Sequence, residues 1–257
     1  MPPRKKFAPY SQIPLVRRLW RGIRLVFVAW ILSVLFFRFV RPPFTPLMAI
    51  RAIEYWSEGK SGMKDWTWKP LGYFPTHVQQ AIIAAEDARF MEHWGVDFSA
   101  LGTVLEQADD KPKLRGASTI TMQTVKNVFL WPGRSYIRKG LEGVMAPVAG
   151  ILWGKRRTLE LYLNVIEWGE GIYGLEAASQ YYYGRPASSL STQEAAALAS
   201  ILPAPRRLSP KALSDASEQR YDRIVKEAPT VAVPSPKPVH ARYQERRDRR
   251  KDREASR

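Results

Sequence analysis

One long apolar run stands out near the start of the chain. Residues 25–37 contain only Ser33 as a polar side chain, and the apolar stretch extends to residues 23–40 with Arg24 and Arg38 near its ends. A helix of 18 residues is about 27 Å long, close to the hydrocarbon thickness of a bilayer. Long arginine side chains can extend from such a helix to the membrane surface. The pattern predicts a transmembrane anchor at residues 23–41.

Helical periodicity dominates the sequence from about residue 76 to residue 202. Val78, Ala81, Ile82 and Ala85 follow the i, i+3, i+4, i+7 spacing of one helix face, and Thr76 can cap the start of that helix. Residues 47–58 and 192–202 are also predicted helices, with loops at 59–72 and 108–115. The glycines at 140, 143 and 150, with the proline at 147, predict a helix after residue 135 that is not straight.

Together these patterns predict a mainly α fold with four parts. Residues 1–22 form a basic cytoplasmic segment, 23–41 the anchor, and 44–212 one globular domain, a size that a single hydrophobic core can support. Residues 213–257 are rich in proline, arginine and aspartate and are predicted to form a basic, disordered tail. No internal repeat is present.

The net charge of +16 is concentrated at the two ends of the chain. Residues 1–41 carry +9 and residues 237–257 carry +5, so the middle holds only +2. This distribution argues against nucleic-acid binding by the folded domain. Seven cations precede Leu25, which places the N-terminus in the cytoplasm by the positive-inside rule. The domain after the anchor is then expected on the opposite side of the membrane from the N-terminus.

Two other features limit the possible classes of protein. A cleaved signal peptide is the alternative to an anchor, but Arg-Pro-Pro-Phe follows the apolar run in place of a small-residue cleavage site. The chain has no cysteine, which excludes disulfides, thiolate catalysis and zinc–sulfur sites. Its three histidines (His77, His93 and His240) are scattered and suggest no metal cluster.

The first candidate for chemistry is the acidic pair Glu86-Asp87. Glu86 lies one turn beyond Ile82, at the edge of the apolar helix stripe. Burial at such a position raises a carboxyl pKa toward the working pH, as a proton-transfer residue requires. The ordinary alternative is a solvated helix end.

Three further blocks follow in order. They are G-A-S-T-I-T-M-Q-T-V-K-N at residues 116–127, R-S-Y-I-R-K-G-L-E at 134–142, and K-R-R-T-L-E-L-Y-L-N at 155–164. With the acidic block at 84–97, this sequence resembles the peptidoglycan glycosyltransferases of family 51, most closely their monofunctional members. The resemblance extends over roughly residues 66–210. It implies a two-lobed, lysozyme-like domain that polymerises lipid II into β-1,4 glycan strands and releases undecaprenyl diphosphate.

The residues themselves fit such a transfer. A lipid-linked sugar diphosphate has a stable anionic leaving group, which needs cations, whereas the acceptor hydroxyl needs a general base on the opposite face. The chain offers a carboxylate at Glu86, a group of cations from Lys126 to Lys139, and a second carboxylate at Glu142.

The resemblance assigns roles to these positions. Glu86 is expected to deprotonate the acceptor 4-hydroxyl, and Glu142 to assist departure of the diphosphate, with a divalent cation (Mg or Mn) as a candidate cofactor there and no organic cofactor. The expected substrate-binding residues are Asp87, His93, Ser118, Thr119, Gln123, Lys126, Asn127, Arg134, Arg138 and Lys139. The implied partners are lipid II, the growing glycan, the membrane and other cell-wall synthesis proteins.

Structural alternatives remain for several of these residues. Arg138 and Lys139 can be ion-pair partners of Glu142 on a helix face, Ser118 and Thr119 can cap a helix, and Glu160 can be structural, with Tyr162 and Asn164 in the same block. The Ser-Gly-Met-Lys at residues 61–64 matches the S-x-x-K of transpeptidases by chance, because no K-T-G accompanies it, so no transpeptidase domain is expected.

Two positions depart from the family pattern. Met122 replaces a usual glutamine, which removes an amide that could contact substrate, and Ala117 replaces a common glycine.

Two other functions compete with glycan synthesis. A lytic enzyme that cleaves glycan would need one glutamic acid of raised pKa but no cation cluster. A catalytically silent scaffold would not need both motif glutamates.

Overall fold

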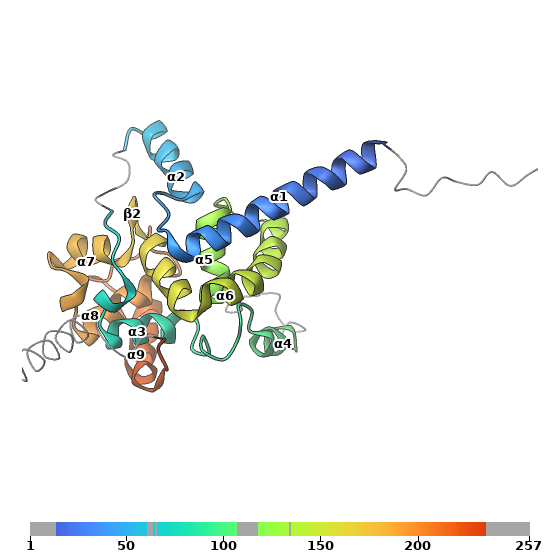
Figure 1. Cartoon of the computed structure of the whole chain (residues 1–257). Coiled ribbons are helices and arrows are strands. Elements are labelled where there is room, and N and C mark those ends of the chain that lie inside the picture. The colour runs from blue at the N-terminus through green and yellow to red at the C-terminus, as the bar shows by residue number, and fades with distance from the viewer. Residues whose placement is uncertain (1–13, 61–63, 65, 107–117, 134, 235–257) are drawn as a thin grey trace, which may run out of the picture. The chain divides into compact units, whose positions relative to one another are not determined.

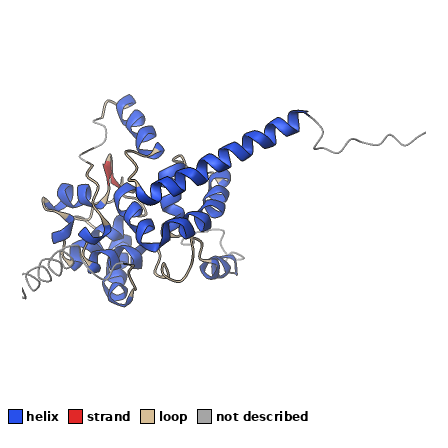
Figure 2. Ribbon diagram, in the orientation of Figure 1, coloured by secondary structure: helices blue, strands red, loops and turns tan. Residues whose placement is uncertain are grey.

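The computed structural model describes residues 14–60, 64, 66–106, 118–133 and 135–234. The chain divides at Val40 into two compact units, and helices form most of both (Figures 1 and 2). The predicted mainly α fold class is confirmed. The helices are α1 (Pro14–Phe39), α2 (Pro46–Ser57), α3 (Thr76–Glu86), α4 (Phe98–Glu106), α5 (Ile120–Phe129), α6 (Tyr136–Val165), α7 (Leu175–Tyr183), α8 (Thr192–Ile201) and α9 (Asp215–Glu227).

The first unit is built around α1. Residues Val16–Phe39 of this helix are apolar and long enough to cross a membrane, and they are almost entirely exposed. An exposed helix of this composition is unfavourable in water, because each buried apolar side chain is worth about 1.5–3 kcal/mol. The helix is consistent with membrane anchoring, and it begins earlier than the predicted anchor.

The second unit has its main core between α3, α8 and α9. Fully buried residues of α3 such as Ile82 and Ile83 belong to one apolar cluster with Leu198 of α8 and Ile224 of α9. The predicted helix at residues 192–202 is confirmed, with its N-terminus fixed by Ser191 in a reciprocal capping box. This core holds the C-terminal end of α3, and therefore Glu86, in a fixed position.

Helices α5 and α6 pack closely along one another and extend beyond this core. A second small cluster joins Val96, Met122 and Ala146. Met122, the departure from the family pattern, is therefore a core residue. Helix α6 is interrupted at Gly154, whose positive φ of 69° is non-helical, rather than at the predicted glycines or at Pro147.

Strand structure is minor among the described residues. Strands β1 (Glu167–Gly169) and β2 (Ile172–Tyr173) form one short antiparallel hairpin after α6 (Figure 2). Short 3-10 helices occur at Leu71–Tyr73, Ala187–Ser189 and Ala228–Thr230.

Two sequence predictions need correction. Thr76 is the first residue of α3 and its side chain makes no capping bond, because Pro75 occupies the cap position. The prediction of a disordered tail from residue 213 is wrong for α9, a formed helix whose Ile224 is completely buried. Residues 235–257 lie outside the described residues.

Candidate active site

Glu86 is the last residue of α3, and it lies at the edge of the main core. Its Oε2 accepts a hydrogen bond of 2.7 Å from Gln123 Nε2 on α5. Burial raises the pKa of the Glu86 carboxyl, while the Gln123 hydrogen bond and the charges of Arg220 and Lys126 act in the opposite direction. The structure thus confirms a half-buried carboxyl with a raised pKa.

Asp87 joins three segments behind Glu86. Its carboxylate accepts hydrogen bonds from His93 Nε2 at 2.9 Å and from the backbone N–H of Ile120, the first residue of α5, at 3.0 Å. The Gly95 N–H donates to His93 Nδ1, so the proton of the neutral ring is on Nε2. Both side chains are buried. These contacts position α3 against α5, which fits an orienting role for Asp87 and His93.

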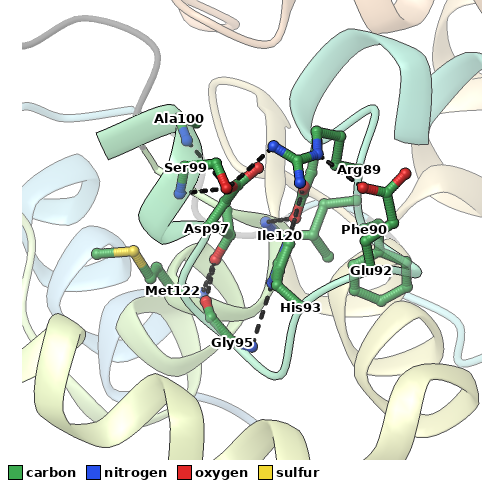
Figure 3. Close-up of polar contacts among 12 residues, drawn as sticks. Arg89, Phe90, Glu92, His93, Gly95, Asp97, Ser99, Ala100, Ile120 and Met122 are labelled. Carbon is green, nitrogen blue, oxygen red and sulfur yellow. Dashed lines mark hydrogen bonds and ion pairs between the residues drawn. The ribbon is translucent and has the colours of Figure 1, made fainter. Parts of the chain in front are cut away.

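The loop after α3 is fixed by its own polar contacts (Figure 3). Asp97 Oδ1 accepts from the N–H groups of Ser99 and Ala100 at 3.0 Å, which caps α4, and Arg89 lies between Asp97 and Glu92.

Gly95 in this loop packs directly on α6. It has φ 131°, and a Cβ there would lie 2.3 Å from the Ala146 carbonyl oxygen. Only glycine fits this close approach, which accounts for the final glycine of the first motif.

Thr119 caps α5, the helix that carries Gln123, Lys126 and Asn127. Its Oγ1 accepts from the Met122 N–H at 3.1 Å and donates to the Gly95 carbonyl. The capping alternative is therefore the role that the structure supports for Thr119, whereas Ser118 is engaged elsewhere.

Glu142 is buried on α6, with 3% of its surface exposed, and two cations meet it. Its Oε1 lies 3.0 Å from Arg138 Nε, and its Oε2 lies 3.4 Å from Lys139 Nζ, which also donates to Ser118 Oγ at 2.5 Å. The ion pairs proposed as an alternative are present. They also hold a cationic group in place, so the structural and functional interpretations are compatible.

Lys126 connects the two glutamates electrostatically. Burial lowers its pKa, and the charges of Glu142 and Glu86 both favour its protonated form. Among the described residues, its ammonium group makes no hydrogen bond or ion pair. Lys126 is therefore available to an anionic ligand between the two carboxylates.

A cavity of about 660 Å³ opens beside these residues. Gln123, Lys126, Asn127 and Arg138 line it, and Asn127 is held by a hydrogen bond of 2.7 Å to the Gln123 carbonyl. Four of the predicted substrate-binding residues thus share one cavity, and two of them, Gln123 and Arg138, contact Glu86 and Glu142. Arg134 lies outside the described residues.

Sequence reasoning missed several cations of the site. Arg51, Arg206 and Arg207 also line the cavity, from α2 and from the segment after α8. Arg220 on α9 acts electrostatically on Glu86. The adjacent arginines at 206–207 come directly after the prolines at 203 and 205, and this pair of cations could have been recognised in the sequence. Arg51 and Arg220, in contrast, are brought to the site only by the fold.

The block at residues 155–164 makes structural contacts, in agreement with the structural alternative given for Glu160, Tyr162 and Asn164. Glu160 accepts the Leu71 N–H at 3.0 Å, and Asn164 accepts the Lys69 N–H at 2.8 Å. Tyr162 is fully buried and donates to Gln123 Oε1 at 3.4 Å, so it supports the residue that contacts Glu86. Lys155 donates to the carbonyls of Phe90 and His93 and secures the same loop from α6.

The described residues fit a divalent metal poorly at Glu142. They contain no group of three or more histidine or acidic residues that could hold an ion. The candidate position has one carboxylate next to Arg138, Lys139 and Lys126, whose charges would repel a metal cation.

The site combines Glu86, a carboxyl with a raised pKa, with Glu142, a carboxylate paired with cations. This combination suits an enzyme that transfers a sugar from an anionic leaving group. Comparison with known proteins agrees with this class. The family model described as Transglycosylase matches residues 56–229, so the chain belongs to the transglycosylase family.

Several curated proteins resemble the chain over most of their length. A biosynthetic peptidoglycan transglycosylase of Marinomonas sp. is 46% identical over 222 residues, which cover 84% of this chain and 95% of that protein. The protein of the same name from Caulobacter vibrioides is 48% identical over 192 residues, with 74% and 81% covered. The one from Rhodospirillum centenum is 45% identical over 205 residues, with 78% and 85% covered.

Proposed function

We propose that this protein is a peptidoglycan glycosyltransferase of bacterial cell-wall synthesis. It polymerises lipid II into β-1,4 glycan strands and releases undecaprenyl diphosphate. The observation that carries the proposal is the half-buried Glu86, held by Gln123, with Lys126 electrostatically coupled both to it and to the cation-paired Glu142. The names of the similar proteins support peptidoglycan as the product.

Glu86 acts as the general base. Its carboxylate takes the proton of the acceptor 4-hydroxyl as that oxygen attacks C1 of the donor sugar. The bond from C1 to the diphosphate oxygen breaks on the opposite face, and the bonding electrons leave with the diphosphate. Glu86 then returns its proton to solvent.

The cations near Glu142 stabilise the leaving diphosphate. Lys126 carries the ammonium group without a described partner, while Arg138 and Lys139 are held in position by Glu142. Fixed charges that need not reorganise stabilise a developing anion efficiently. Glu142 thus orients cations, and no step of this mechanism passes through a metal ion.

A lytic function is less well supported. Cleavage of glycan would use the raised pKa of Glu86, but it would leave the cluster of Lys126, Arg138 and Lys139 without a task, because no diphosphate departs.

We also propose that the protein is a single-pass inner-membrane protein with a cytoplasmic N-terminus and a periplasmic catalytic domain. Helix α1 supplies the anchor. A second apolar contact is offered by the α6 stripe, which we define as Ile137, Leu141, Val144 and Ile151. These residues are exposed and spaced i, i+4, i+7, i+14 along one helix face.

The four consecutive large apolar residues at 128–131, Val-Phe-Leu-Trp, also suggest a membrane patch from sequence, but they fit one less well than this stripe. Val128 and Leu130 are buried core residues, and Phe129 stacks on Trp153 with ring centroids 5.9 Å apart, while only Trp131 is exposed. Half of that candidate patch is therefore core.

The direct test of function is incubation of the purified full-length protein with lipid II, followed by gel analysis and assay of released undecaprenyl diphosphate. Glycan polymer with an equivalent release of diphosphate supports the proposal. Cleavage of preformed glycan without polymer would support a lytic enzyme instead, and neither activity would support a scaffold.

A further inference from the structure

The cavity has a second end that the proposed reaction does not use. The reaction end is lined by Gln123, Lys126, Asn127 and Arg138. The second end, which we call the arginine end, is lined by Arg51, Glu167, Glu170, Arg206 and Arg207. Both ends belong to one space of about 660 Å³, a volume typical of pockets that bind small ligands.

Internal contacts account for only part of the charge at the arginine end. Arg51 is paired with Glu54 at 2.5 Å, and Glu167 accepts a hydrogen bond of 2.7 Å from Tyr55. Arg206 stacks over the Tyr55 ring, 5.3 Å from its centroid, and reaches Glu170 only at 3.7 Å. The Arg206 guanidinium is thus oriented by an aromatic face, and its ion pair with Glu170 is long and shared with Lys60.

Several donors at this end are unsatisfied. The buried Nε atoms of Arg51 and Arg206 have no hydrogen-bond partner among the described residues, although Arg51 Nε lies 4.0 Å from Glu167 Oε2. Arg207 is exposed, and its guanidinium makes no hydrogen bond or ion pair with any described residue. Buried polar groups without partners are uncommon in folded proteins. A row of such donors along a cavity wall is arranged for a ligand that accepts hydrogen bonds.

We propose that Arg206 and Arg207 form a subsite that binds a carboxylate of the peptide branch carried by the glycan substrate. This inference rests on the proposed function, because a peptidoglycan precursor bears a peptide on its sugar. The diphosphate belongs to the reaction end, where Lys126 lies between the two glutamates, so the anion that remains for the arginine end is a peptide carboxylate.

The chemistry of the side chains favours this ligand. A guanidinium presents parallel N–H donors in a planar fork that matches the two oxygens of a carboxylate. Glu170 and Glu167 flank the arginines and limit the net positive charge. A flanked pair of guanidinium groups suits a singly charged carboxylate better than a diphosphate.

The kinetic test uses lipid II with free peptide carboxylates and the same substrate with those carboxylates converted to amides. In Arg206→Gln/Arg207→Gln, we expect KM for the carboxylate substrate to rise about 10-fold or more, as expected for loss of a charge-assisted hydrogen bond, with kcat little changed. KM for the amide substrate should be the same in wild type and variant. Arg223→Gln, an exposed arginine of α9, is the control for loss of positive charge and should change neither value.

A binding test is independent of catalysis. The probe is the soluble disaccharide–peptide without lipid or diphosphate, titrated into the full-length protein in detergent by calorimetry. We expect binding to wild type and to Glu86→Gln, and weaker binding to the double arginine variant and of the amidated probe. If no polymer forms but this pattern holds, the proposed function fails and the subsite stands.

Three results would overturn the subsite. Equal binding of the carboxylate and amide probes would show that no carboxylate is recognised. Unchanged binding and unchanged KM in the double variant would show that these arginines are not the site. Displacement of the probe from wild type by inorganic pyrophosphate, but not from the double variant, would assign the arginine end to a diphosphate instead.

Discussion

At the scale of single residues, the chemistry of the site depends on the pKa of Glu86. Burial raises this pKa, and the Gln123 N–H opposes the increase by stabilising the carboxylate. A base must be ionised to accept a proton, so activity should increase as the pH passes the pKa of Glu86 from below. Gln123 therefore limits how far burial raises the pKa of Glu86.

Gln123→Met removes the hydrogen bond that lowers the pKa of Glu86. We expect the acid limb of the profile of kcat/KM against pH to move to higher pH, because the carboxylate is less stable without its donor. The measurement is the polymerisation rate across a pH series. Gln180→Met, at an exposed position of α7, is the control and should leave the limb in place. A limb that stays fixed or moves to lower pH would contradict the role of Gln123.

At the scale of elements, α9 is the part of the fold that was wrongly assigned from sequence. Its composition is polar, but Ser217, Tyr221 and Ile224, continued by Ala228 and Val231 just after the helix, follow the i, i+4, i+7, i+11, i+14 spacing of a buried helix face. All five are buried or packed against the main core. The signal was present, and the many charged residues on the other face concealed it.

Two neighbouring residues of α9 test this assignment. Ile224 is completely buried and Val225 is 37% exposed. Ile224→Ala should destabilise the domain by about 2–5 kcal/mol through loss of buried contacts and the cavity left behind. Val225→Ala on the same helix should change stability by less than about 0.5 kcal/mol. Chemical unfolding of the two variants measures the difference, and equal stabilities would show that α9 does not belong to the core.

The other elements show how far sequence reasoning extends. The helix with Ser191 as its cap could be predicted, because capping and periodicity are local. The bend of α6 was expected among residues 140–150, yet it occurs at Gly154, and composition alone does not show which of several glycines adopts the positive φ. Glu86 and Glu142 were found from motif order, whereas Arg51 and Arg220 enter the site only through tertiary contacts that no local pattern encodes.

At the scale of the whole molecule, the proposed reaction takes place next to a membrane. The substrate's lipid keeps it in the bilayer, so the anchor and the α6 stripe both raise the local concentration of enzyme near it. In the proposed arrangement the two contacts differ in kind, because α1 would retain the protein in the membrane while the stripe would orient the catalytic domain.

The variant Ile137→Gln/Val144→Gln/Ile151→Gln tests the stripe. Glutamine is a good helix former, so we expect an unchanged melting temperature and unchanged activity on detergent-dispersed lipid II. Activity on lipid II in vesicles should fall on the order of tenfold, because three apolar side chains no longer bury in lipid. Val128→Gln provides the contrast, since that residue is core and its substitution should lower the melting temperature. Full activity of the triple variant on vesicles would show that the stripe does not contact the membrane.

The central claim is that Glu86 is the base, and Glu86→Gln tests it most directly. The change is nearly isosteric, and loss of general-base assistance should lower the polymerisation rate on lipid II by about 100–10,000-fold. The raised pKa means that the folded state favours protonated Glu86 over ionised Glu86. The stability that the protonated form provides is lost as the pH rises through that pKa. The melting temperature of Glu86→Gln at pH 7 should therefore be no lower than that of wild type. A folded variant that retains more than about a tenth of the wild-type rate would contradict this role of Glu86, because loss of a general base should leave a much lower rate.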